Sequence, residues 1–538
     1  MKKVIKRRAI VPDDHLYDVA HPKLRQIFAS RNINETTELG NSLQQLISIE
    51  LMAGLPEACA VLFEHLSVQN RITVVGDFDA DGATSTSLMM LALSMLGGKN
   101  HDYLVPNRFE YGYGLTPEIV DIAAEQGTKL IITVDNGISC FAGVEHAKSL
   151  GIAVIVTDHH LPGGSLPPAD AIINPNQHEC NFPSKAIAGV GVAFYFMMAF
   201  RKYLREKDWF AQMHLSEPNL AQLLDLVALG TVADVVSLDR NNRILVEQVL
   251  KRIRAGATRP GIQALIEVAG KNQQRMVASD FGFALGPRIN AAGRLDDMAY
   301  GIQCLLADDL MSARVMAAEL DGLNRSRREI EQGMQNEAEI ILKQLKFDSQ
   351  NLPYSIALFH PEWHQGVIGI VAGRIKEKFH RPTIVFAAAE NGREIKGSAR
   401  SIPGLHIRDL LEAIHCKHPS LINKFGGHAM AAGLSIDVDN FEAFKLAFEQ
   451  EAMRLLDEDK LIGIILSDGE LLSDEMTLSF AEEIRHSGPW GQNFPEPIFD
   501  DKFEIIQQRI VGDKHLKLVV QKGQTAFDAI AFNVDVNV

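Results

Sequence analysis

The sequence predicts an α/β fold, built on a doubly wound and mostly parallel sheet. From about residue 70 to 160, short β-branched runs alternate with helical stretches, as in strands joined by crossover helices. A second, smaller α/β unit begins near Tyr354 after a long charged helix, and the tail changes to alternating strands typical of a β-barrel. At 538 residues the chain is too long for one core, so several domains are expected.

Apolar runs that end at turn residues predict the strands of the first unit. These runs are RITVVGD (71–77), KLIITVDNG (129–137) and AVIVTDHH (153–160). Three intervening stretches have helical composition: TSTSLMMLALSML (84–96), TPEIVDIAAEQG (116–127) and FAGVEHAKSLG (141–151). The last two stop at a glycine. Residues 185–345 are predicted to be mostly helical.

The remaining elements follow in chain order. The second unit is predicted from the strand YSIALF, the helix GVIGIVAGRIKEKF and the strand PTIVFAAA, and the tail from the strands FEIIQQRIV, KHLKLVVQ and AFDAIAFNV. The sequence stops directly after a strand, which leaves open whether the last domain is complete. We therefore predict an N-terminal segment (1–69), a first α/β domain with its helical part (70–320), a connecting helix (321–350), a second α/β domain (351–440) and an OB-like β-domain (441–538).

Charge and composition limit the classes of protein. The net charge is −15, from 53 basic and 68 acidic residues, which does not suit a protein that coats nucleic acid by bulk attraction. A polyanionic substrate is still permitted if bound cations and a local basic groove reverse the field. The most apolar run, AGVGVAFYFMMAF, is shorter than the roughly 20 residues of a membrane span. With five cysteines in no paired spacing and no signal-peptide pattern, we expect a cytoplasmic protein without membrane contact.

Three aspartates occupy alternate positions directly after the first predicted strand, in the motif DFDADG. Asp77, Asp79 and Asp81 would all be ionised at neutral pH and would repel one another. Either a cation holds them together or they are splayed into water. A calcium-binding EF-hand loop is excluded, because its twelfth position is Leu88 instead of glutamate and a strand precedes it. A solvent-exposed acidic turn remains the alternative.

Similar side chains follow the next two predicted strands. Asp135 follows the second strand, and Asp158, His159 and His160 follow the third. Because the carboxyl ends of parallel strands face one crevice, these groups are expected to meet there. Oxygen ligands with one imidazole suit Mn²⁺ or Mg²⁺, and clustered carboxylates can hold two ions about 3.5–4 Å apart. The residues alone therefore predict metal-dependent phosphodiester hydrolysis, with Asp135 as the central, shared carboxylate.

The motifs DFDADG, VDNG, TDHH and ALGTVADVVSL together resemble the DHH phosphoesterase superfamily. Further motifs, in order from about residue 70 to 436, resemble its bacterial exonucleases that are specific for single strands: PNRFEYGYGL, GPRINAAGRLDD, HPEWHQGVIGIVAGR, KGSARS and KFGGHAMAAG. The resemblance implies release of 5′-mononucleotides from single-stranded DNA in the 5′-to-3′ direction. It also implies roles in DNA repair, mismatch repair and recombination, with a single-strand-binding protein and a repair helicase as partners.

The resemblance also implies two sets of metal ligands. One ion would be held by Asp79 and Asp135, with Asp77 nearby. The other would be held by Asp81, Asp135, His159 and Asp234.

Other site residues follow from the same likeness. His160 would contact the scissile phosphate or the leaving group, and Asp158 would orient a neighbouring histidine or simply stabilise the turn. The pyrophosphatase branch has a histidine four residues before its first motif aspartate, where this sequence has Val75. That departure favours the nuclease branch and leaves Asp77 as the substitute ligand.

The second α/β unit resembles the DHHA1 module, which grips the substrate end. The motif KGSARS sets Lys396, Ser398 and Arg400 on alternate positions, and Arg suits bidentate phosphate binding. GGHA would offer backbone N–H groups beside His428. Two arginines are weaker additions to the phosphate-binding set: Arg108 and Arg374.

Further residues could line the path of a strand. Arg325, Arg327 and Arg328 on the connecting helix would either contact the strand or form a solvated face. Tyr111 and Tyr113 would either stack on bases or pack in a loop. The OB-like domain would offer a surface for single strands.

Two other functions compete with this interpretation. A DHH-type oligoribonuclease or cyclic-dinucleotide phosphodiesterase would share the metal site, but such relatives are generally shorter and lack the extra β-domain. A non-catalytic scaffold that binds DNA would tend to lose motif acids, and every one of them is present here.

Overall fold

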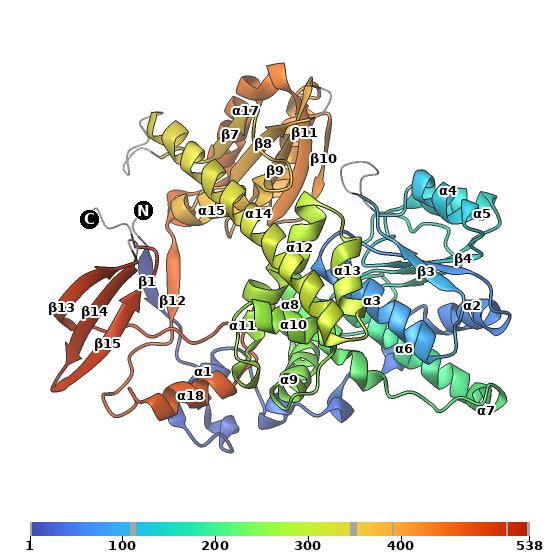
Figure 1. Ribbon diagram of the computed structural model, residues 1–538. Coiled ribbons are helices and arrows are strands. Elements are labelled where there is room, and N and C mark those ends of the chain that lie inside the picture. Colours follow the sequence, from blue (N-terminus) through green and yellow to red (C-terminus); the bar gives the residue numbers. More distant parts are fainter. Residues whose placement is uncertain (1–2, 108–113, 345–351, 390–391, 513–514, 535–538) are drawn as a thin grey trace. The chain divides into compact units, whose positions relative to one another are not determined.

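The computed structural model describes residues 3–107, 114–344, 352–389, 392–512 and 515–534 (Figure 1). The chain divides into two compact units. The first contains residues 41–463 and 491–493, and the second contains residues 3–40, 464–490 and 494–538. Within the described residues no single helix is long and apolar enough to cross a membrane, although one bent pair, 43–51 with 55–67, passes by length and composition.

The first unit contains the predicted parallel sheet. Its strand order is β3-β2-β4-β5-β6, and every neighbouring pair is parallel (Figure 1). The three predicted strands are confirmed as β2 (Ile72–Val75), β4 (Leu130–Val134) and β5 (Ala153–Thr157). Two further strands close its edges, β3 (His101–Leu104) and β6 (Ala171–Ile173). The central strands are fully buried, as expected for a sheet covered on both faces.

Helices cover both faces of this sheet. One face packs on α4 (Pro117–Glu125) and α5 (Phe141–Ser149). The other contacts α3 (Ala80–Met95), α6 (Gly189–Glu206) and α2 (Leu55–Ser67). Helix α3 is buried on nearly all sides, which explains why its sequence lacks amphipathic periodicity. It begins at Ala80 because the Asp79 carboxylate caps it, accepting from the backbone N–H groups of Asp81 and Gly82.

The predicted helical region follows the sheet. It comprises α7 (Trp209–Gln212), α8 (Leu224–Ala233), α9 (Arg240–Arg254), α10 (Pro260–Val268), α11 (Ala278–Asp280), α12 (Gly286–Leu295), α13 (Ala299–Leu306) and α14 (Leu310–Gln344). Helix α14 contacts α10, α12 and α13 before it reaches α15, so it joins the helical region to the second sheet.

The second sheet is mixed, with strand order β10-β11-β9-β8-β7. Its strands are β7 (Ile356–His360), β8 (Thr383–Ala388), β9 (Glu394–Arg400), β10 (Lys424–Gly427) and β11 (Ala431–Asp437). Only β7 and β8 are parallel; the other pairs are antiparallel. Helices α14 and α15 (Ile368–Phe379) pack on one face, and α16 (Ile407–Lys417) and α17 (Phe441–Leu455) on the other.

The second unit combines the two ends of the chain. Strand β1 (Val4–Arg7) pairs in parallel with β12 (Ile464–Ser467), and the predicted β-rich tail forms the antiparallel sheet β13 (Glu504–Val511), β14 (His515–Lys522) and β15 (Thr525–Ala531). Helices α1 (Pro22–Ala29) and α18 (Leu478–His486) complete the unit. A buried bidentate pair joins the segment after α1 to the segment after β12, in which Arg31 donates to the Asp468 carboxylate over 2.8 and 3.0 Å.

Candidate metal centre and substrate cavity

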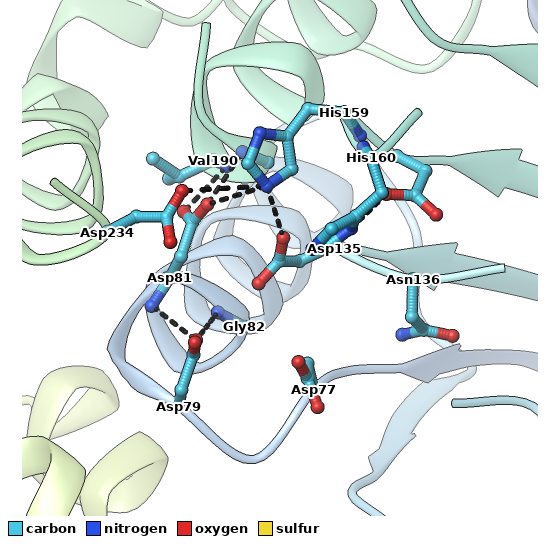
Figure 2. A network of polar contacts seen from close by, with 12 residues as sticks. Asp77, Asp79, Asp81, Gly82, Asp135, Asn136, His159, His160, Val190 and Asp234 are labelled. Atoms are coloured by element: carbon cyan, nitrogen blue, oxygen red, sulfur yellow. Dashed lines mark hydrogen bonds and ion pairs between the residues drawn. The ribbon is translucent and has the colours of Figure 1, made fainter. Parts of the chain in front are cut away.

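The predicted acids and histidines meet at the carboxyl edge of the parallel sheet (Figure 2). They come from the loop after β2, the first turn of α3, the ends of β4 and β5, and the end of α8: Asp77, Asp79, Asp81, Asp135, Asp158, His159, His160 and Asp234. The carboxyl ends of β2, β4, β5 and α8 and the amino end of α3 all face the same crevice. The geometry that the strand pattern predicted is therefore present.

Two triads of possible ligand atoms lie side by side. Asp77, Asp79 and Asp135 each place one carboxylate oxygen within 4.8 Å of the others. In the second triad a ring nitrogen of His159 lies within the same distance of one oxygen each of Asp81 and Asp234. Asp135 also groups with His159 and His160, so it links the two triads (Figure 2). The arrangement offers two adjacent cation sites with a carboxylate between them.

The imidazole of His159 tests whether a cation fits. Its Nε2 lies 3.1 Å from Asp135 Oδ1, 3.6 Å from Asp234 Oδ2 and 3.9 Å from Asp81 Oδ2. This nitrogen is buried and makes no hydrogen bond to any residue that the structure describes. Burial lowers the pKa of His159 to about 4, so the ring is neutral and cannot balance the carboxylates. In the tautomer with its proton on Nδ1, the neutral ring aims its Nε2 lone pair among carboxylate oxygens, which fits a divalent metal ion.

The negative charge of the buried carboxylates also needs a counter-charge. Burial, reinforced by neighbouring aspartates, raises the pKa of Asp81 to about 7 and holds the pKa values of Asp135 and Asp234 well above their usual range. Ionising all three in a buried site without counter-charge is unfavourable. Bound cations would supply that charge.

These shifts predict a pH-dependent stabilisation by metal. Because the raised pKa values favour the protonated folded state, metal-free stability should fall as pH rises from about 5 to about 8. Cations bind the ionised carboxylates, so Mn²⁺ should raise Tm more at about pH 8 than at about pH 5, by on the order of several degrees. Thermal unfolding with Mn²⁺ and with EDTA at both pH values measures this. An equal metal effect at both pH values would contradict it.

Two glycines let helices approach the acids closely. The backbone N–H groups of Gly189 and Val190, in the first turn of α6, donate to Asp81 over 2.7 and 2.9 Å. A Cβ on Gly189 would lie 2.7 Å from Asp135 Oδ1, and one on Gly230 would lie 2.7 Å from Asp81 Oδ1. The sequence AGVGVAF indicated only a buried helix. Its role in holding Asp81 went unpredicted, and the glycine at the helix start is the one signal for it.

Backbone strain marks the same place. Asp135 adopts φ +62°, and Val235, directly after Asp234, adopts φ +59°. Left-handed backbone is unfavourable for these residues, above all for β-branched valine. Surrounding structure therefore holds both aspartates in position.

Asp158 contacts His160 rather than the ring of His159. It accepts from His160 Nδ1 over 2.7 Å, from the backbone N–H groups of His159 and His160, and from Ile138 N. Burial alone would lower the pKa of His160, but the bond to Asp158 outweighs it and raises the pKa to about 9. The His160 ring stacks on His428 from the second domain, with centroids 6.3 Å apart. A positively charged imidazole thus lies at the edge of the triads.

A cavity of about 540 Å³ adjoins the metal triads. Asp79 belongs to both, and the cavity extends from it to the open face of the second sheet, past Asn290 and Arg294 of α12. Its size is that of ligand pockets in general. A molecule bound there would have one end beside the carboxylates.

Arg400 lies at the sheet side of this cavity, as does Ser398. The Arg400 guanidinium is largely buried, and burial lowers its pKa. It donates to Ser398 Oγ over 3.0 Å and to the Ala399 carbonyl over 2.8 Å. No carboxylate of the described residues lies within ion-pair distance. A buried cation without an acid is unfavourable unless an anion binds to it.

Several predicted residues lie elsewhere. Arg374 is half-exposed on α15, where its Nε donates to Glu331 Oε1 over 3.0 Å, and it does not line this cavity. Arg327 is buried against Glu331, and Arg325 pairs with Asp321. Arg328, like these two arginines, lies on α14, and it is exposed. Three predicted residues fall outside the described part of the chain: Arg108, Tyr111 and Tyr113.

Helix α12 is a part of the site that the sequence did not predict. Asn290 Oδ1 accepts from Ala80 N over 2.9 Å, and Arg294 Nη1 donates to the Gly366 carbonyl over 3.0 Å. A Cβ on Gly293 would lie 2.0 Å from the Phe78 carbonyl oxygen. The helix therefore connects the aspartate loop to the loop before α15. The glycine and asparagine of GPRINAAGR were the available signal.

Gly293→Ala is expected to displace the aspartate loop. Because backbone atoms block the new methyl group, either helix or loop must move, and Mn²⁺ affinity should fall at least about tenfold. Gly322→Ala is the matched control, since nothing lies within 4 Å of its Cβ position in α14. That change should raise stability by up to about 1 kcal/mol. Calorimetric Mn²⁺ titration and thermal unfolding distinguish the two. Unchanged metal affinity in Gly293→Ala would contradict the coupling.

Comparison with known proteins places the chain. Three family models match it: the DHH family, N-terminal domain (residues 71–231), the DHHA1 domain (351–454) and the RecJ OB domain (467–537). The chain is 57% identical to the single-stranded-DNA-specific exonuclease RecJ of Dickeya dadantii, over 98% of this chain and 92% of that protein. It is 56% identical to the RecJ of Escherichia coli, over 99% and 92%.

Solved structures agree. The crystal structure of RecJ from Thermus thermophilus in complex with Mn²⁺ superposes with a TM-score of 0.80 at 30% identity, covering 98% of this chain and 74% of that chain. The Mg²⁺ complex of RecJ from the same organism gives 0.72 at 28% identity, covering 96% and 71%. The resemblance stated from the motifs is confirmed, and the chain belongs to the RecJ family.

Proposed function

We propose that this protein is a metal-dependent exonuclease that degrades single-stranded DNA from the 5′ end and releases 5′-mononucleotides. The names of its relatives support the class of reaction and the substrate. The observation that carries the mechanism is the position of Asp79, which belongs both to a triad of possible metal ligands and to the wall of a cavity that is also lined by Arg400. That arginine is largely buried and pairs with no carboxylate of the described residues. A strand end in that cavity would present its first phosphodiester to the metal site.

The ligands of two divalent cations, Mn²⁺ or Mg²⁺, are proposed from the triads. Asp77, Asp79 and Asp135 would hold one ion. Asp81, Asp135, His159 and Asp234 would hold the other. When bound, the ions would cancel the carboxylate charge and activate water for attack on phosphorus.

The chain's own residues supply the remaining roles. Ser398 and Arg400 bind the phosphate of the terminal nucleotide, because a hydroxyl lies there beside a guanidinium that pairs with no carboxylate of the described residues. Attack on the next phosphorus breaks its bond to the 3′ oxygen of that nucleotide. His160, kept protonated by Asp158, lies beside the triads and can donate a proton to the departing oxygen. His428 stacks on His160 and fixes its ring from the second domain.

The wider role follows from the family likeness. We infer a function in DNA repair, mismatch repair and recombination, exercised in the cytoplasm. A single-strand-binding protein and a repair helicase are proposed partners on that ground alone. Strand specificity would follow if the cavity admits a single strand, since a duplex end would have to separate before one strand could enter.

End-labelled DNA tests the proposal. Single-stranded DNA labelled at the 5′ or the 3′ end is digested with Mn²⁺, with Mg²⁺ and with EDTA, beside duplex DNA and RNA. We expect metal-dependent release of the 5′ label as a mononucleotide from the start of the reaction. The 3′ label should appear in a mononucleotide only after the rest of the strand has been degraded. Turnover of short RNA or cyclic dinucleotides without DNA cleavage would move the protein to another branch of the superfamily. DNA binding without hydrolysis would indicate a scaffold.

A further inference from the structure

One face of the second sheet is open where it lines the cavity. Side chains of alternate residues share a face of a strand, and the register aligns them into rows. Lys424, Ser435 and Lys396 form one row across β10, β11 and β9. Gly426, Gly433 and Ser398 form the next row. All six line the cavity.

The middle row leaves the floor of the cavity bare. Nothing lies within 4 Å of the Cβ positions of Gly426 and Gly433. Arg400 follows one row beyond Ser398 on the same strand face, opposite Ala431. A trough therefore runs over the small residues of the middle row, with Arg400 beyond Ser398 at one end and the two lysines at the other.

The lysines differ from ordinary edge charges. Lys396 and Lys424 flank Ser435 from the two neighbouring strands, about 10 Å apart by strand spacing. Among the described residues, no carboxylate lies within ion-pair distance of either ammonium group. The next row outward is acidic, where Glu394 pairs with Asp437 in the register and Asn423 donates to both over 2.7 and 2.9 Å. The positive trough thus ends at the lysine row.

We propose that Lys396, Ser435 and Lys424 form a second phosphate subsite, one row beyond Ser398. Two residues along a strand span about 6.8 Å, so a phosphate at Ser398 and Arg400 would leave a further phosphate within reach of both ammonium groups. This inference rests on the proposed function, because it takes the first phosphate to be that of a DNA strand.

The ligand is a phosphate group beyond the first one, and it has two sources. A 5′-triphosphorylated strand carries its outer phosphates there. Alternatively, a monophosphorylated strand advances by one nucleotide and places its terminal phosphate there. Hydrolysis then breaks the bond between the second phosphodiester's phosphorus and the 3′ oxygen. Water is consumed, a dinucleotide with a free 3′-hydroxyl leaves, and the strand keeps a 5′-phosphate.

A binding assay tests the first source, a 5′-triphosphorylated strand. The 538-residue chain with Asp135→Asn is titrated by fluorescence anisotropy with 3′-labelled single-stranded DNA bearing a 5′-monophosphate or a 5′-triphosphate. We expect the triphosphate to bind about tenfold tighter, and the ratio to fall to about 1 on adding Lys396→Ala with Lys424→Ala. The slope of log K against log salt should be steeper for the triphosphate by about 0.7 per added contact. Lys445→Ala on α17 is the control and should keep the ratio.

The length of the product tests the second source, a monophosphorylated strand advanced by one nucleotide. The otherwise wild-type protein, with and without the double lysine substitution, digests monophosphorylated single strands. A dinucleotide product that the wild-type lysines give and the double substitution abolishes would show that the subsite holds the terminal phosphate of a strand advanced by one nucleotide. Equal affinities for both ends together with unchanged product lengths would overturn the subsite. Absence of any DNA cleavage, with the triphosphate preference intact, would overturn the proposed function while leaving the subsite standing.

Discussion

Replacement of Asp135 by asparagine is expected to lower kcat on single-stranded DNA by at least about a thousandfold, or about 4 kcal/mol of transition-state stabilisation. Asp135 groups with Asp77 and Asp79 on one side and lies 3.1 Å from His159 Nε2 on the other. Losing its charge therefore weakens both proposed cation sites at once. Nuclease assays at saturating Mn²⁺ and calorimetric metal titration measure the two effects.

The thermal stability of Asp135→Asn separates a loss of catalysis from misfolding. Without metal, Asp135→Asn should unfold at the same or a higher temperature than the wild type, because asparagine replaces a buried carboxyl group whose ionisation is unfavourable among neighbouring acids. Asp102→Asn, a half-exposed aspartate on β3, serves as the matched control and should leave both activity and metal affinity unchanged. An Asp135→Asn protein that is inactive and also markedly less stable would indicate a structural role instead.

Arg400→Met is expected to weaken binding of 5′-phosphorylated single strands by about a hundredfold, or about 2.7 kcal/mol. Methionine preserves much of the apolar length but removes the guanidinium that faces the cavity beside Ser398. A charge-assisted hydrogen bond contributes about 1.5–3 kcal/mol, so loss of the phosphate contact accounts for the effect. Affinity for a 5′-hydroxyl end should change much less.

The control for this prediction is Arg374→Met. Arg374 was also predicted to bind phosphate, but it pairs with Glu331 outside the cavity. Its substitution should leave the affinity ratio between 5′-phosphate and 5′-hydroxyl ends unchanged, which anisotropy titration measures. The reverse pattern, with loss in Arg374→Met and none in Arg400→Met, would assign the phosphate site to α15.

Local pattern was sufficient for the central strands and for the acids that follow them. Asp77, Asp135 and His159 each come directly after a buried apolar run, and parallel strands bring their carboxyl ends to one edge. The two missed strands are the edges of the sheet, β3 and β6. HDYL is partly polar and half-exposed, and AII is only three residues long, so neither offers the longer apolar run that identified the other strands.

Asp234 marks the limit of local reasoning. Within its own segment it is an acid at the end of an apolar helix, and only family likeness placed it with the metal ligands. It reaches Asp81 because α8 packs against α3, and Gly230 makes that approach possible. Such a contact depends on two surfaces and is absent from the pattern of either one.

The sequence by itself determined the fold class, the carboxylate and imidazole chemistry, and the choice of divalent cations, because these depend on residue type and on neighbours along the chain. Tertiary structure decided which arginine faces the cavity, how α12 joins the aspartate loop to the second domain, and that β1 pairs with β12 more than four hundred residues away. The physical reason is that periodicity records which face of an element is buried. It does not record what that face is buried against.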